Sequence, residues 1–177
     1  MTKLFCIYFL SLFSFGIPMQ EFPQMKCENL NGKPISIPDD VKGKKTVVAI
    51  ALSSKAEKEL RAWNKPLYNS LIADGMGGML GGRMYDANLC FVGLVKGIAK
   101  LAYSEIKSQC KKNVDKKLYE NFMLTEMEPD ILKAALEIKN ANEPLFFVLD
   151  KDGKIIYRTS GEYSDKKLNE ITEKLIN

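Results

Sequence analysis

The side chains most able to do chemistry in this chain are its four cysteines, Cys6, Cys27, Cys90 and Cys110. They are widely separated, and no two of them have the Cys-x-x-Cys spacing of a redox pair. The chain has no histidine, which excludes Ser-His and Cys-His nucleophile pairs and every histidine metal site. The lack of histidine narrows the possible enzyme classes, and thiol chemistry in this chain would need a site without a known motif.

The three later cysteines differ in their expected reactivity. Cys90 lies in an apolar run, where burial raises a thiol's pKa and makes it inert. Cys110 is followed by Lys111 and Lys112, which would lower its pKa if the thiol were exposed, so we expect it to be the most reactive. Cys27 precedes the first predicted hairpin and could pair with either of the others. If residues 1–16, which hold Cys6, are removed on export, three cysteines remain. An odd number of cysteines in an exported chain leaves at least one thiol free or bound to another molecule.

Other patterns that could carry chemistry are better explained as structure. Asp150 and Asp152 flank a predicted turn, and this spacing is typical of turn chemistry rather than of an acid-base pair or a calcium site. The glycine-rich segment 75–83 has neither a Gly-Lys-Ser/Thr nor a Gly-x-Gly-x-x-Gly motif, so we expect a loop that packs or touches a partner. We expect no cofactor and no metal.

The N-terminus has the pattern of a secretory signal peptide. Lys3 precedes a short apolar run, and Gly16 offers a small residue at a plausible cleavage point. We therefore expect a signal peptide at residues 1–16, a single domain at residues 17–177, and a secreted or periplasmic protein. Removal of Lys3 lowers the formal charge from +4 to +3, which indicates no nucleic-acid partner. No integral membrane segment is expected after the signal peptide, and the oligomeric state stays open.

The elements that must position these residues follow from hydrophobic periodicity. Residues 22–28 are expected to be extended, and the order β, β, α, β, α, α, β, β, α is predicted for the rest. Within residues 96–119 the lysines Lys100, Lys107, Lys111 and Lys112 should lie mostly on the solvated face. The predicted strands are a short strand ending at 37, then 46–52, 88–95, 145–149 and 154–159. The predicted helices are 53–74, 96–119, 130–139 and one that begins at Ser164-Asp165. Ser53 or Ser54 is expected to be the N-cap of the first helix.

Three segments give the chain a resemblance to a known family. They are Leu30-Asn31-Gly32-Lys33-Pro34-Ile35-Ser36, Gly43-Lys44-Lys45-Thr46-Val47-Val48, and the segment from Pro144 to Ile155. In this order they resemble the redoxin branch of the thioredoxin fold, meaning TlpA-like and peroxiredoxin-like proteins. The resemblance implies an α/β fold with a central mixed β-sheet flanked by helices and a helical insertion before the final hairpin. It also implies that Pro144 is the family's cis proline, whose loop faces the active-site turn.

The chain departs from the redoxin pattern at the redox turn. Lys55 and Lys58 stand where the two cysteines of the family would be, and Ser54 stands where a tryptophan is common. A second resemblance is to the mitochondrial assembly factors for ATP synthase, which share the frame without catalytic cysteines. It rests on Ser53-Ser54-Lys55-Ala56-Glu57 and on the basic helical region 96–119.

We therefore predict an exported thioredoxin-fold protein with a degenerate redox site that acts as a non-catalytic peptide- or protein-binding or assembly module. The partner would occupy a groove near Pro144. The alternative is a thiol-disulfide oxidoreductase or antioxidant redoxin that uses Cys110, Cys90 or Cys27. The residues expected to line the groove are Ser53, Ser54, Lys55, Lys58, Glu143 and Pro144.

Overall fold

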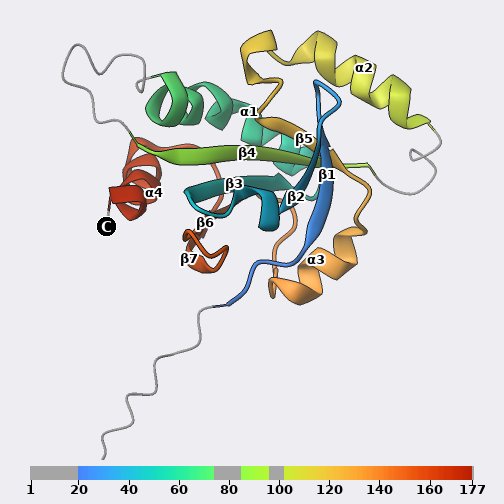
Figure 1. Cartoon of the computed structure of the whole chain (residues 1–177). Helices are drawn as coiled ribbons and strands as arrows, with labels where there is room; N and C mark the ends of the chain where they lie inside the picture. Colours follow the sequence, from blue (N-terminus) through green and yellow to red (C-terminus); the bar gives the residue numbers. More distant parts are fainter. Residues whose placement is uncertain (1–19, 74–84, 96–101, 177) are drawn as a thin grey trace, which may run out of the picture.

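The computed structural model describes residues 20–73, 85–95 and 102–176 as one mixed sheet with helices on both faces (Figure 1). No helix in these ranges is long and apolar enough to cross a membrane. The predicted α/β fold with a central mixed sheet is confirmed. The strands are β1 Met25–Asn29, β2 Pro34–Ile37, β3 Lys45–Ala51, β4 Ala87–Leu94, β5 Phe122–Thr125, β6 Leu145–Leu149 and β7 Ile155–Ser160. The helices are α1 Ser54–Tyr68, α2 Tyr103–Asn113, α3 Pro129–Ala135 and α4 Asp165–Ile176.

β3 forms the centre of the sheet, whose strand order is β2-β1-β5-β4-β3-β6-β7. It pairs in parallel with β4 and antiparallel with β6. Its residues from Thr46 to Ala51 are buried on both faces, which is why this strand reads as a continuous apolar run rather than an alternating one.

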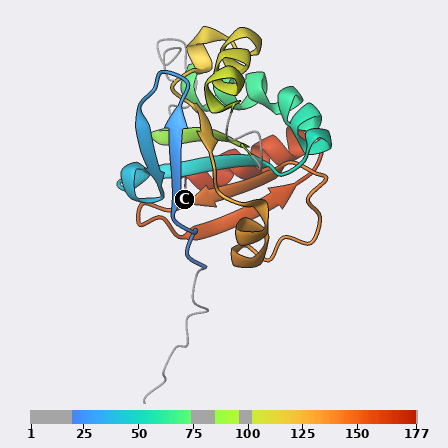
Figure 2. The ribbon, with the colours of Figure 1, turned by 90° about the vertical axis from the view of Figure 1, so that its right-hand side faces the viewer.

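The two faces of the sheet carry separate cores. On one face Val48, Ile50 and Cys90 pack against Leu132 and Leu136 from α3 and its C-terminal end. On the other face the strands pack against α1 and α4, and Figures 1 and 2 show α1 and α2 on the side opposite α3. The sheet therefore separates the helices into two layers.

Trp63 anchors α1 to the second core. Its ring is buried, and the centre of the ring lies 4.2 Å from the centre of the Phe146 ring and 5.2 Å from the centre of the Tyr163 ring. Its indole N–H donates to the carbonyl of Gly161 at 3.1 Å, so the buried polar atom is satisfied. Ser53 caps the helix by accepting from the amide of Ala56 at 3.2 Å, as the sequence predicts.

Strand β5 is absent from the predicted order and is the main correction to it. This four-residue strand pairs in parallel with β4 and antiparallel with β1, so it joins the N-terminal hairpin to the rest of the sheet. The sequence prediction overlooked it because three apolar residues followed by Thr125 carry too few periods to mark a strand. The N-terminal extended segment is itself a full strand, β1, paired with β2.

The helical region predicted at 96–119 is shorter in the described residues. α2 ends at Asn113, and only a single turn of 3-10 helix follows at Lys116–Leu118. Lys107, expected on the solvated face, instead forms an ion pair with Glu28 of β1. α3 also ends at Ala135 rather than at 139, because Glu137 adopts a positive φ of 51° that breaks the helix.

Several sequence predictions fall outside the described residues. These are the signal peptide at 1–16, the glycine-rich segment at 75–83, and the part of the basic region that holds Lys96 and Lys100. The Asp150 turn is described: its carboxylate accepts from the amides of Asp152 at 2.9 Å and Lys154 at 2.8 Å, so the predicted turn chemistry is confirmed.

Candidate functional site

The redox-turn position and Pro144 lie at the same end of the sheet. β3, β4 and β5 run in parallel, so their carboxyl ends meet at one edge. β6 runs the opposite way and its Leu145 pairs with Ile50, so Pro144 lies beside the strand end that leads to Ser53. The fold thus brings the two halves of the predicted groove to one edge.

Pro144 is trans, contrary to what the redoxin resemblance implies. The cis peptide bond among the described residues is Ile37–Pro38. Pro144 is buried, and its carbonyl accepts from the amide of Gly161 at 3.0 Å, so it extends the β6–β7 pairing by one residue. Gly161 makes this contact with a φ of 98°, which favours glycine. Pro144 therefore acts as the start of a strand, and its place in the sequence could not specify the isomer.

Glu143 is held by its own loop. Its two carboxylate oxygens accept from the Asn140 side-chain amide at 2.9 Å and from the Ser160 hydroxyl at 3.0 Å. On the other side of the predicted groove, Ser54, Lys55 and Lys58 are exposed. Of the residues expected to line the groove, the surface therefore presents these three, whereas Glu143 and Pro144 support the fold.

Cys27 and Cys90 are buried, unpaired thiols in the same core. Burial raises the pKa of each thiol to about 12. Cys27 lies on β1 and Cys90 on β4, and β5 runs between these strands. Two interstrand spacings amount to about 9.6 Å, which exceeds the ~7 Å limit between the Cα atoms of a disulfide. These two cysteines therefore cannot form a disulfide without a rearrangement of the sheet.

Cys110 is half-buried on α2 and is also unpaired. The expectation of a lowered pKa is wrong: burial, and then the charge of Glu57, raise the pKa of this thiol, and Arg61 opposes them. Neither adjacent lysine is among the groups that shift this pKa, and the Lys111 ammonium lies 5.9 Å from the centre of the Tyr119 ring. Cys110 lies on the α1 side of the sheet, away from the core that holds Cys27 and Cys90.

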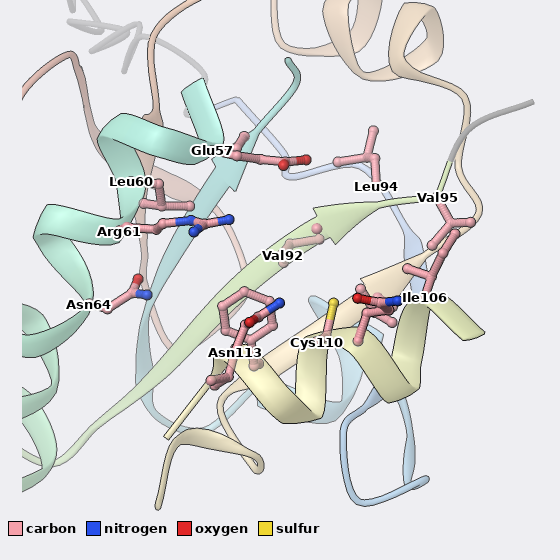
Figure 3. Close-up of a pocket in the computed structure, with 16 residues that line it drawn as sticks. Glu57, Leu60, Arg61, Asn64, Val92, Leu94, Val95, Ile106, Cys110 and Asn113 are labelled. Carbon is pink, nitrogen blue, oxygen red and sulfur yellow. The ribbon is translucent and has the colours of Figure 1, made fainter. Parts of the chain in front are cut away.

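A cavity of about 280 Å³ lies between α1 and α2 at this end of the sheet (Figure 3). Glu57, Arg61 and Asn64 line it from α1, and Cys110 lies on the opposite wall, which α2 forms. The apolar lining includes Leu60, Val95, Ile106, Phe122 and Leu124, and the polar lining includes Glu57, Arg61, Asn64, Gln109 and Asn113.

Sequence reasoning missed this cavity because five separate segments build it. One signal was present: Glu57, Arg61 and Asn64 recur at spacings of four and three, so they share one stripe of α1 beside its buried stripe. The described residues contain no group of three or more acidic or cysteine side chains that could hold a metal ion.

The comparisons with known proteins fit this geometry. A family model described as ATP10 protein matches residues 20–175. The chain belongs to the ATP10 family. This family assignment agrees with the second of the two sequence resemblances, in which a redoxin frame lacks the catalytic cysteines. No curated protein matches the chain significantly.

Solved structures similar to this ATP10-family chain are redoxins, and at their low identity they show the fold alone. StoA from Bacillus subtilis is 22% identical, covers 85% of this chain and 96% of its own, and has a TM-score of 0.55. The exposed lipoprotein thioredoxin Etrx1 from Streptococcus pneumoniae is 19% identical, with 85% and 99% covered and a TM-score of 0.55. BsSco, a member of the Sco family of cytochrome c oxidase assembly proteins, is 13% identical, with 88% and 93% covered and a TM-score of 0.55. The thioredoxin-like fold of this ATP10-family chain is thereby confirmed.

Proposed function

We propose that this chain is a non-catalytic protein-binding module that serves assembly of a protein complex. The observation that carries the proposal is the state of its thiols. The redox turn presents Lys55 and Lys58 in place of cysteines, and burial raises the pKa of each thiol that the structure describes.

Disulfide exchange needs an accessible thiolate and a second thiol that resolves the mixed disulfide. Cys27 and Cys90 are inaccessible, and the sheet lies between them and Cys110. A redoxin scaffold without these parts can still bind an extended segment at the end of its sheet. The exposed Ser54, Lys55 and Lys58 would meet such a partner first.

Two comparisons support an assembly role. This chain of the ATP10 family resembles the mitochondrial assembly factors for ATP synthase, and BsSco, which shares its fold, belongs to a family of cytochrome c oxidase assembly proteins. Both are redoxin-fold proteins associated with the building of a larger complex. We extend that role, and the presence of a protein partner, to this chain.

We further propose that the chain is exported and that residues 1–16 are removed, which leaves a mature domain of residues 17–177. The first 16 residues contain one lysine, no arginine and a short apolar run. That pattern suits a secretory signal better than a mitochondrial presequence, which is amphipathic and rich in arginine. A secreted or periplasmic location follows from this reading.

A disulfide-reduction assay on the purified mature chain, residues 17–177, tests the proposal. The wild type is compared with a Cys110→Ser variant and with a variant in which Cys27, Cys90 and Cys110 are all changed to serine, with circular dichroism to verify the fold. We expect no turnover from any folded protein. Turnover that Cys110→Ser abolishes would overturn the proposal and favour a thiol oxidoreductase, for which the placement of Cys110 beside Arg61 in a cavity is the supporting observation.

A further inference from the structure

We infer that the cavity between α1 and α2 is a docking pocket for one apolar side chain of an extended partner peptide, whose main chain Arg61 and Asn64 hold. The inference rests on the proposed function in that the partner is a protein. It differs from the predicted groove at Pro144, because that proline is buried and the pocket lies on the α2 side of the redox turn.

The floor and the sides of the pocket are apolar. Val95, Leu124 and Phe122 come from the ends of β4 and β5, and Leu60 and Ile106 close the sides from the two helices. The volume of about 280 Å³ is at the lower limit of small-molecule and cofactor pockets, which span ~300–1,000 Å³. A pocket of this size and lining suits a single large apolar side chain.

Two polar groups on the α1 wall, the exposed Arg61 and the partly buried Asn64, are available to a ligand. Arg61 projects into the space between the helices (Figure 3) and forms no ion pair within the described part of the chain. The side-chain oxygen of Asn64 is buried and has no hydrogen-bond partner in the same part of the chain. Because buried polar atoms are rarely left unpaired, this oxygen indicates a missing donor.

The two groups match the main chain of a peptide. Arg61 and Asn64 are three residues apart on one helix, so they face the same side. The guanidinium can donate to a peptide carbonyl, and the Asn64 oxygen can accept from a peptide N–H. A peptide main chain offers both groups beside a side chain that enters the pocket.

The charge of the pocket favours a neutral occupant. Glu57 lies one turn before Arg61 on the same wall, so the two formal charges cancel, and the other polar lining residues are neutral. A phosphate or a strongly acidic ligand would be repelled by Glu57, and a basic one by Arg61. An apolar side chain on an uncharged main chain avoids both costs.

Peptide titration of the full-length chain, followed by NMR, tests the inference. The probe is the pentapeptide acetyl-Gly-Gly-Leu-Gly-Gly-amide, and two matched peptides carry Asp or Lys in place of Leu. We expect saturable shifts of the methyl signals of Leu60, Val95, Ile106 and Leu124 with the leucine peptide. The Asp and Lys peptides should bind at least about tenfold more weakly.

Two variants and a matched control make the test specific. Arg61→Gln should weaken binding about tenfold, as expected for loss of a charged hydrogen bond. Lys65→Gln removes the same charge from an exposed position one turn further along α1 and should leave binding within about twofold. Asn64→Leu should also weaken binding. The variant protein should nevertheless melt at the same or a higher temperature than the wild type, because the substitution removes an unpaired buried oxygen.

Three results would overturn the inference. They are the absence of saturable shifts with the leucine peptide, shifts confined to Ser54, Lys58 and the Pro144 loop, or equal weakening by Arg61→Gln and Lys65→Gln. Each of them leaves the disulfide-reduction assay unaffected, so failure of the pocket and failure of the non-catalytic assignment are separate outcomes.

Discussion

Of the three thiols in the described residues, Cys110 is the one that solvent reaches first, because it is half-buried whereas Cys27 and Cys90 are buried. Its raised pKa leaves little thiolate at neutral pH. We expect iodoacetamide to label Cys110 slowly at pH 7 and faster as the pH rises into the alkaline range, with no labelling of Cys27 or Cys90 until the chain unfolds. Mass spectrometry of the digested protein measures all three rates. Fast labelling of Cys110 at pH 7 would contradict the raised pKa.

The two buried thiols also predict how stability depends on pH. In the unfolded chain each thiol ionises near its ordinary pKa of 9.0, whereas in the folded chain burial raises that pKa to about 12. Release of these protons stabilises only the unfolded state above pH 9, so the free energy of unfolding should fall as the pH rises. The loss at pH 10 is about 1 kcal/mol for each thiol.

Urea unfolding at pH 8 and pH 10 measures this loss, and the Cys90→Ala variant provides the comparison. The variant starts less stable because it leaves a cavity, but its loss between the two pH values should be smaller by the share of one thiol. Equal losses in the two proteins would show that other groups, such as the tyrosines and lysines, govern the alkaline range.

The environments of the thiols could be predicted only in part from the sequence. The residues next to Cys110 in the sequence are lysines, but those that act on its thiol are Glu57 and Arg61, which come from another helix. Burial of Cys90 was predictable, because a thiol within a continuous apolar strand is expected to be covered on either face of the sheet. Proximity along the chain is therefore a weak guide to pKa wherever helices pack face to face.

At the scale of the element, the stability of α1 depends on the cap at its N-terminus. Ser53 accepts the Ala56 amide, while Ser54 is the exposed first residue of the helix and makes no cap. We expect Ser53→Ala to lower the free energy of unfolding by about 1 kcal/mol and Ser54→Ala to change it by less than about 0.5 kcal/mol. Thermal melts of the two variants compare them directly. If both variants lost the same stability, the capping assignment would be wrong.

α2 is the helix least firmly attached to the fold. None of its residues is fully buried, and the ion pair of Lys107 with Glu28 ties it to β1. We expect Lys107→Met to speed hydrogen exchange of the α2 amides several-fold while those of α1 stay unchanged, because the lost contact is local. Lys112→Met, which alters an exposed lysine on the same helix, is the control and should have no effect.

Long or strongly patterned elements were predictable from the sequence. β3 is a buried seven-residue strand, the β6–β7 hairpin is marked by its Asp-Gly turn, and α4 has an apolar stripe. β5 and the pocket beside it were not predictable, because β5 is short and the pocket depends on how distant segments meet. The isomer of Pro144 was also beyond reach, since a proline at the start of a strand is compatible with the trans form.

For the whole molecule, the proposed export makes a prediction about the mature chain. Cleavage after Gly16 would give a protein that begins at Ile17. The first described residues, Gln20 to Phe22, would then lie near the new N-terminus, where they hydrogen-bond to the turn of the β6–β7 hairpin. We expect the intact mass of the protein recovered from the extracytoplasmic fraction of expressing cells to match residues 17–177. Recovery of the uncleaved chain from the cytoplasm would contradict the signal-peptide assignment.

The position of β5 also sets an order of events during synthesis. The β1–β2 hairpin can close as soon as residue 37 has been made, but Glu28 and Asn29 find their partners, Leu124 and Met123, only about 90 residues later. At ~5–20 residues per second, the free edge of β1 would stay without a neighbour for roughly 4 to 18 s. During that interval the nascent chain presents an unpaired strand to whatever chaperone or translocation machinery receives it.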